Sequence, residues 1–168
     1  TPSAGSRTTW TFSTWFKLGN RAGGYILSAG GDASNSSTYI YTTANAMRIE
    51  RYNGDGSYAW RCNVGSRLFR DPTAWYHLVV VYDSSNGVEA SRLKVYINGV
   101  LETNSFIAGY SDATAIPLNY ETDVNDTNAT RLFGYWLNGS DAWDGYMAET
   151  HFIDGAVVAQ TSFGETGD

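Results

Sequence analysis

The sequence has a single cysteine, Cys62, among 168 residues, which rules out an internal disulfide. A chain of this length buries about 70% of the surface that its unfolded form exposes, so it needs no disulfide or other covalent cross-link to fold. Secreted animal domains of this size commonly carry cystines, and their absence favours folding in a reducing cytosol, as bacterial or viral structural proteins do. Because Cys62 lies in an alternating segment, we expect it to be a small buried apolar residue.

Charged residues are also scarce, at 17% of the chain, and the net charge of −6 argues against a surface that tracks nucleic-acid phosphates. The aromatic content of 15% excludes a disordered chain. No apolar run approaches the roughly 20 residues of a membrane helix. Two histidines and one cysteine provide few ligands for a zinc site. A Ser–His–Asp triad needs one histidine, but His77 and His151 are both interpreted as hydrogen-bonded structural residues. The glycine stretch at 30–31 lacks the lysine and following helix of a phosphate loop.

Helical periodicity is almost absent, and alternating apolar and polar residues recur between Gly, Asn, Asp and Ser turns. The segment 75–82 is apolar on both faces, which predicts a central strand covered on both sides. Asn98-Gly99 predicts a two-residue hairpin, and 107–130 a long polar loop. The pattern favours an all-β, antiparallel two-sheet sandwich. Further strands are expected over 10–17, 25–28, 38–41, 46–52, 58–64, 92–97, 100–103, 131–136 and 146–153.

Three segments carry a resemblance to a known family: Trp75–Asp83, Leu93–Val100 and Asp144–Glu149. They are similar to the "W-Y-H-V-A" strand, the "L-Y-V-N-G" hairpin and the closing strand of laminin-G-like and pentraxin-like domains of the concanavalin A-like superfamily. Thr150 departs from the closing motif, which is matched only in part. The resemblance implies a jelly roll of the concanavalin A-like lectin/glucanase type. We expect one such domain over 1–168, within a longer chain because its ends have linker composition.

A narrower resemblance involves the segments 69–77, 144–155 and 162–166. They look like a subgroup found in marine phage virion proteins. This implies a module on a tail fibre or capsid, at the virion surface or otherwise extracellular. The partners it implies are other virion subunits, and a homo-oligomer is left open as well.

Laminarinase-type glucanases share this fold and use two carboxylates about 5 Å apart for retaining hydrolysis. The nearest string here is Glu149–Asp154, in which Glu149 and His151 share a face but Asp154 has the wrong parity and is expected in the turn that follows the strand. No other expected strand carries two carboxylates on one face. We therefore expect no enzyme, with a glycoside hydrolase as a distant alternative. His77, amid Leu and Val, is expected to be a hydrogen-bonded sheet residue.

The acidic loop Asp123–Asn128 offers hard oxygen atoms at short spacing, as Ca²⁺ requires. Many relatives in the resembled families bind Ca²⁺ with such loops. Asp123, Asn125 and Asp126 are the first candidate ligands for Ca²⁺. A solvated acidic loop without metal is the alternative.

Carbohydrates are bound by aromatic faces and by side chains that hydrogen-bond to hydroxyls, usually at loop rims. The segment 135–144 has that composition, and 58–60 offers a second platform, although large aromatics also fill sandwich cores. Trp10, Phe12 and Trp75 are expected in the core. We expect non-catalytic recognition of a cell-surface glycan, or alternatively an architectural virion module. The candidate carbohydrate-binding residues are Tyr135, Trp136, Asn138, Asp141, Trp143, Tyr58 and Trp60.

Overall fold

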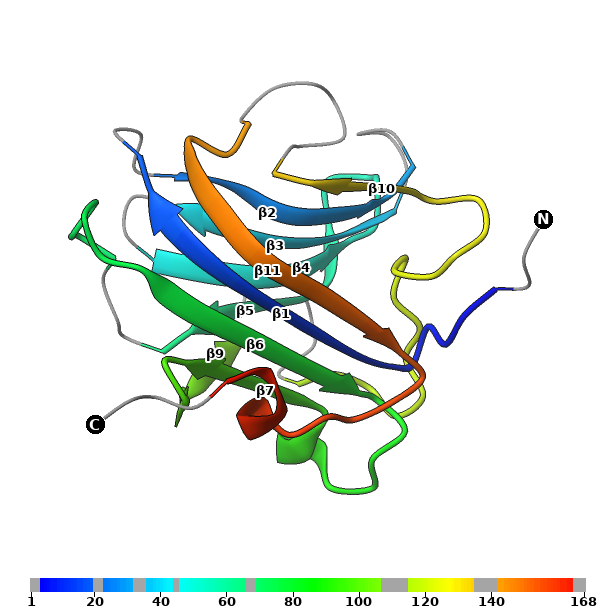
Figure 1. Ribbon diagram of the computed structural model, residues 1–168. Helices are drawn as coiled ribbons and strands as arrows, with labels where there is room; N and C mark the ends of the chain where they lie inside the picture. The colour runs from blue at the N-terminus through cyan, green and yellow to red at the C-terminus, as the bar shows by residue number, and fades with distance from the viewer. Residues whose placement is uncertain are drawn as a thin grey trace.

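The computed structural model describes residues 4–19, 23–31, 36–43, 46–65, 69–106, 115–134 and 142–164. Two antiparallel sheets form the domain (Figure 1). The five-stranded sheet has the order β11-β1-β6-β7-β8, with β11 Gly145–Asp154, β1 Thr9–Leu18, β6 Tyr76–Asp83, β7 Leu93–Ile97 and β8 Val100–Leu101. The six-stranded sheet has the order β10-β2-β3-β4-β5-β9, with β10 Thr130–Phe133, β2 Gly23–Gly30, β3 Ser37–Thr43, β4 Ala46–Tyr52, β5 Tyr58–Val64 and β9 Asn104–Phe106.

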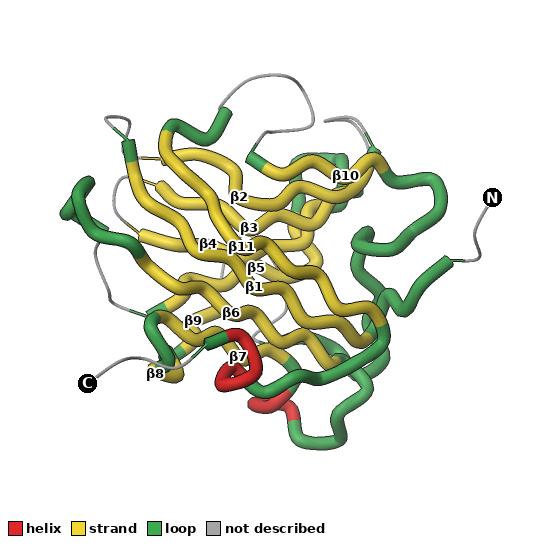
Figure 2. The backbone as a smooth tube through the Cα atoms, in the orientation of Figure 1, coloured by secondary structure: helices red, strands yellow, loops and turns green. Residues whose placement is uncertain are grey.

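The two sheets lie face to face, and the all-β jelly-roll sandwich expected from the sequence is confirmed (Figure 1). Helix in the described residues amounts to two 3-10 turns, η1 Glu89–Ser91 and η2 Gln160–Phe163, both coloured red in Figure 2. Neither is long and apolar enough to cross a membrane. Strands with alternating apolar and polar residues have one apolar face. In a sandwich, the apolar faces of the two sheets pack against each other and are both buried.

Aromatic rings fill the space between the sheets. Trp10 stacks on Tyr82 at 5.2 Å between ring centroids, and Trp60, from the other sheet, stacks on Tyr82 at 6.1 Å. Trp10, Phe12 and Cys62 are fully buried, as the sequence pattern predicted. Offset ring pairs of this kind add roughly 0.5–1.5 kcal/mol each beyond their buried area. These contacts hold the two sheets in one relative placement.

β6 is buried on both faces, as expected from its unbroken apolar run. Its inner face meets the core, and on its outer face Val79 and Val81 are also buried. The segment that follows β11 is hydrogen-bonded to the outer face of the same sheet at Thr11. The Thr11 hydroxyl donates to the carbonyl of Ala156 at 2.8 Å and accepts from the amide of Val158 at 3.1 Å.

The hairpin between β7 and β8 follows the Asn98-Gly99 prediction. Both turn residues have positive φ, 50° for Asn98 and 75° for Gly99, and Ile97 pairs with Val100 across the turn. A type I′ turn requires this conformation at both central positions, and Asn and Gly tolerate it best.

Two expectations about the strands are wrong. Trp75 is 43% exposed and lies before β6 rather than in the core, because the strand begins only at Tyr76, after a turn at Pro72. Asp154 was expected in a turn but is the last residue of β11, paired with Trp10. Its carboxylate accepts hydrogen bonds from the Ser6 amide and the Asn125 side chain.

Candidate functional site

The outer face of the six-stranded sheet carries a cluster of polar and aromatic side chains. Side chains alternate between the faces of a strand, and Ile40, Met47, Ile49 and Cys62 belong to the core. The residues between them therefore point to the opposite face of the sheet. We call this surface the tyrosine–arginine face. It comprises Tyr25, Tyr39, Tyr41, Arg48, Glu50, Tyr58, Arg61 and Asn63.

An ion pair lies at the centre of the tyrosine–arginine face. Glu50 and Arg61 are directly opposed in the β4–β5 register, and the Arg61 Nε lies 2.8 Å from the Glu50 Oε2. The Tyr41 hydroxyl donates to the same Glu50 oxygen at 2.8 Å and accepts from the Arg61 Nη2 at 3.1 Å. The three groups thus form a closed ring, in which two hydrogen bonds and one ion pair connect each group to the other two.

Burial changes how the groups of this ring titrate. Only 3% of Glu50 is exposed, and this desolvation raises the pKa of its carboxyl despite the Tyr41 hydrogen bond and the Arg61 charge. Burial, followed by the negative charge of Glu50, raises the pKa of Tyr41 to about 12. Tyr41 therefore stays protonated and keeps donating to Glu50. Groups whose pKa values are shifted by burial together with a specific charged partner are candidates for a functional site, although structural ion pairs shift pKa values as well.

Tyrosine rings border the ion pair on both sides. Tyr25 stacks on Tyr41 at 4.9 Å and meets Tyr39 edge-on at 5.2 Å. On the other side, the Arg61 guanidinium lies 4.5 Å from the centre of the Tyr58 ring. Tyr25 and Tyr58 are half-buried, and 12% of the Arg61 side chain is exposed. The rings thus surround the charges while keeping part of their own surface accessible.

A bulge in β5 decides which aromatic side chains reach this face. Arg51 pairs with Trp60 but Tyr52 pairs with Tyr58, so Ala59 is an extra residue that reverses the alternation. Tyr58 consequently points outward with Arg61, whereas Trp60 points into the core and is completely buried. Trp60 was a candidate for carbohydrate contact, and that assignment is wrong because none of its ring is accessible.

The loop 135–141, with the candidates Tyr135, Trp136, Asn138 and Asp141, lies outside the described residues. Trp143 is described and is half-buried rather than displayed. Its ring meets Phe16 edge-on at 5.7 Å, and its backbone amide donates to the Gly134 carbonyl at 2.7 Å. Trp143 therefore packs against the core at one end of the sandwich.

The three calcium candidates have different surroundings. Asp123 is 3% exposed, and its carboxylate accepts hydrogen bonds from Ser36 and Thr38 and lies 2.9 Å from the Arg51 Nε. The Asn125 amide group donates to the Ser6 carbonyl and to Asp154. Asp123 and Asp126, but not Asn125, line a cavity of about 230 Å³.

These contacts bear on how well the loop suits calcium. Arg51 already neutralises the Asp123 carboxylate, and Arg7 pairs with Asp126 at 3.2 Å. Within the described ranges, no group of three or more His, Cys, Asp or Glu side chains is placed to hold a metal ion. Ca²⁺ also accepts amide, hydroxyl and backbone oxygens, which this cavity supplies through Ser36 and Asn128. Calcium binding at Asp123, Asn125 and Asp126 stays a prediction.

Comparison with known proteins gives the family. The model of the concanavalin A-like lectin/glucanases superfamily matches residues 2–161, which is nearly the whole chain. The chain belongs to this superfamily. No curated protein matches this concanavalin A-like domain in sequence.

Solved structures with the same fold include the CBM40 of the Ruminococcus gnavus IT-sialidase bound to alpha2,3 sialyllactose. It has a TM-score of 0.63 and 16% identity, over 96% of this chain and 81% of that one. Domain 4 of AbnA, a Geobacillus stearothermophilus arabinanase in complex with arabinotriose, has a TM-score of 0.59 and 15% identity, over 96% and 66%. A Limulus polyphemus SAP-like pentraxin has a TM-score of 0.51 and 16% identity, over 89% and 65% of the two chains.

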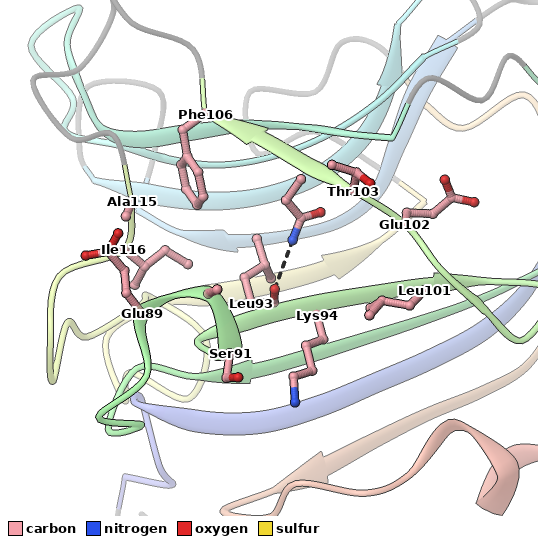
Figure 3. Close-up of a pocket in the computed structure, with 12 residues that line it drawn as sticks. Glu89, Ser91, Leu93, Lys94, Leu101, Glu102, Thr103, Phe106, Ala115 and Ile116 are labelled. Atoms are coloured by element: carbon pink, nitrogen blue, oxygen red, sulfur yellow. Dashed lines mark hydrogen bonds between the residues drawn. The ribbon is translucent and has the colours of Figure 1, made fainter.

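A second hollow of this concanavalin A-like domain lies where β7 and β9 approach each other (Figure 3). This cavity has a volume of about 490 Å³, and Leu93, Phe106 and Ile116 give it an apolar lining. The Asn104 side-chain amide donates to the Leu93 carbonyl at 2.9 Å. The residues that line this cavity form no buried ion pair. The tyrosine–arginine face is therefore the stronger candidate for the functional site.

Most of the tyrosine–arginine face was missed from the sequence. The signal was present as polar residues at every second position, in Tyr39-Ile40-Tyr41, Arg48-Ile49-Glu50 and Arg61-Cys62-Asn63. In a strand of a sandwich, such residues are normally attributed to a solvated outer face. What distinguishes them here is their mutual pairing, which only the strand register brings about.

Proposed function

We propose that this domain binds carbohydrate on its tyrosine–arginine face and does not chemically change it. The observation that carries the proposal is the ring of Tyr41, Glu50 and Arg61 on the outer side of the sheet. A buried ion pair contributes little net stability, because desolvation offsets most of the attraction. Such a pair among tyrosine rings is well suited to orienting hydrogen-bonding groups toward a ligand.

The chemistry of the face matches that of a sugar. Sugar rings present apolar C–H surfaces, which pack on aromatic rings, and hydroxyl groups, which need donors and acceptors. Tyr25 and Tyr58 are half-buried and provide the accessible part of their rings, and Asn63 and the arginines provide polar groups. Because Glu50 and Tyr41 hold Arg61 in place, the side chain loses little additional freedom when a sugar binds.

Two of the structures with this fold are complexes with sugars, sialyllactose for the Ruminococcus gnavus CBM40 and arabinotriose for domain 4 of AbnA. The likeness supports carbohydrate binding as the first hypothesis to test. Fold alone does not determine function, so the proposal depends on the residues of the face.

A catalytic role has less support. Glycoside hydrolysis uses a pair of carboxylates that flank the scissile bond. Strands β2 to β5, which are described in full, contain one carboxylate, Glu50, and Arg61 neutralises it. We therefore propose a binding module rather than an enzyme.

The setting we propose is adhesion by a phage structural protein at the virion surface, where many copies would strengthen a weak site. The resemblance of segments 69–77, 144–155 and 162–166 supports this setting. The loop residues Tyr135, Trp136, Asn138 and Asp141 remain our candidates for additional sugar contacts. A purely architectural module is the alternative, and it predicts no glycan binding.

The test is a broad glycan array with the wild-type domain and Tyr58→Ala. We expect binding to specific glycans, and Tyr58→Ala should weaken it about tenfold through the loss of one stacking surface. Tyr96→Ala is the matched control, because Tyr96 is a half-buried tyrosine on the outer face of the other sheet. Absence of binding to every glycan, or equal losses for Tyr58→Ala and Tyr96→Ala, would overturn the proposal.

A further inference from the structure

We propose that the tyrosine–arginine face selects glycans with a negatively charged substituent, and that Arg48 is the residue that recognises the charge. This inference rests on the proposed carbohydrate-binding function. The shared chemistry of the ligand is a carboxylate or a sulfate ester attached to a sugar ring. The argument depends on the charge of the face, the partners of Arg48 and its position among the tyrosines.

The tyrosine–arginine face is positive in a protein that is negative as a whole. Strands β2 to β5 place Arg48, Arg61 and Glu50 on this face, which leaves one uncompensated positive charge. The chain has a formal net charge of −6. An anionic glycan is therefore repelled by most of the molecule and attracted locally at this face.

Glu50 lies in the field of both arginines, but its ion pair is with Arg61 and its hydrogen bond is with Tyr41, so the excess positive charge is that of Arg48. The Arg48 Nε donates to the Asn63 Oδ1 at 2.9 Å, directly across the β4–β5 register. In the part of the chain that the structure describes, no carboxylate forms an ion pair with Arg48, and its two Nη groups have no hydrogen-bond partner. The side chain is half-buried, so its charge is less hydrated than that of a surface arginine.

The remaining Nη groups of Arg48 suit an anionic substituent on a sugar. A guanidinium presents parallel N–H groups that match two oxygen atoms of a carboxylate or a sulfate. Asn63 fixes the Nε side of the guanidinium, which orients the Nη side before a ligand arrives. Arg48 is also opposite Tyr41 in the β3–β4 register, and Tyr41 stacks with Tyr25. Tyr41 itself is buried, so the accessible stacking surface beside it is the half-buried Tyr25, its partner in the β2–β3 register. A sugar ring packed on Tyr25 would lie two strands from Arg48, within reach of a substituent that extends across Tyr41.

The experiment compares binding to matched pairs of glycans that differ only in charge. The pairs are sialyllactose and lactose, polygalacturonate and its carboxyl-reduced form, and a sulfated galactan and its desulfated form. The proteins are the wild type, Arg48→Gln and Arg48→Lys. Arg70→Gln is the matched control, because Arg70 is an exposed arginine outside the face and its loss changes the net charge equally.

We expect the wild type to prefer the charged member of at least one pair, and rising ionic strength should weaken that preference. Arg48→Gln should lose roughly tenfold or more of its affinity for the charged glycan and little for the neutral one. Arg48→Lys should show an intermediate loss, and Arg70→Gln should match the wild type. Whether the carboxylate or the sulfate pair responds identifies the substituent.

Three results would count against the inference. Equal binding of charged and neutral members overturns it but leaves carbohydrate binding intact. A preference that survives Arg48→Gln, in a variant whose thermal midpoint is unchanged, overturns the role of Arg48. Absence of binding to any glycan overturns the proposed function together with this inference, so the two failures are distinguishable.

Discussion

The Ser13 hydroxyl lies 2.9 Å from the Nε2 of His77, and the two residues link β1 and β6 on the outer face of the five-stranded sheet. His77 is 5% exposed and stacks on Trp15 with 4.7 Å between ring centroids. Burial lowers the pKa of His77, Glu149 raises it and His151 lowers it further. The imidazole therefore stays neutral at a pH where an exposed histidine is already charged.

This environment predicts that acid destabilises the domain through His77. As the pH falls through the ordinary value of 6.5, the unfolded chain takes up a proton that the folded state resists. The free energy of unfolding should fall as the pH decreases from about 8 to about 5, on either side of that value. Urea unfolding at several pH values measures it. His77→Gln should flatten the profile, whereas His151→Gln should reduce the His77 contribution only in part, because burial, the largest cause of the lowered pKa, remains. Identical slopes for wild type and His77→Gln would contradict the prediction.

Trp60 should contribute to stability and not to sugar binding. The Trp60→Ala variant leaves a cavity beside Tyr82, and we expect it to lose about 3–5 kcal/mol of unfolding free energy. Tyr58→Ala, two residues away on the other face, should cost less than about 1 kcal/mol. Urea denaturation of both variants tests this. Loss of glycan binding by Trp60→Ala with unchanged stability would instead favour an exposed ring.

Trp143 should also act mainly through packing. Because its ring meets Phe16 edge-on and is half-buried, Trp143→Ala should lower the unfolding free energy by about 2 kcal/mol or more. The thermal midpoint should fall accordingly. The exposed Trp75, as Trp75→Ala, is the matched control with a smaller expected shift. An unchanged midpoint for Trp143→Ala would favour the alternative that this tryptophan serves the ligand.

Calcium binding by the acidic loop has a simple thermal test. A ligand that binds only the native state stabilises it by mass action, so adding a chelator should lower the melting temperature if Ca²⁺ is bound. Asp126→Asn should abolish that response, because Asp126 lines the cavity and its partner Arg7 lies near the surface. No shift on chelation would retire the calcium prediction. Asp123 is less suitable for this test, because its removal leaves Arg51 buried without its partner.

The fold was predictable because it depends on patterns that are local in sequence. The unbroken run in β6, the Asn98-Gly99 turn and the alternation in β7 each identify one element without knowledge of the others. Trp75 was assigned wrongly because its sequence neighbours are strand-forming, while the strand begins one residue later. Local pattern determines the type of an element better than its ends.

The candidate site was less predictable, because its residues come from four strands and meet only through register. Tyr58 and Trp60 are two positions apart, which is the spacing of neighbouring residues on one face of a regular strand. The bulge at Ala59 sends them to opposite faces, and nothing in the local composition marks that bulge. Glu50 and Arg61 are eleven positions apart in the chain and become an ion pair only because β4 and β5 align them.

The sequence by itself determined that this chain forms an all-β sandwich with an aromatic core, because a period of two and the turn residues follow from backbone geometry alone. The tertiary structure decided which polar residues became a buried network and which tryptophans became core. That outcome depends on strand register and on one extra residue in β5, since a shift of one residue exchanges the two faces of a strand.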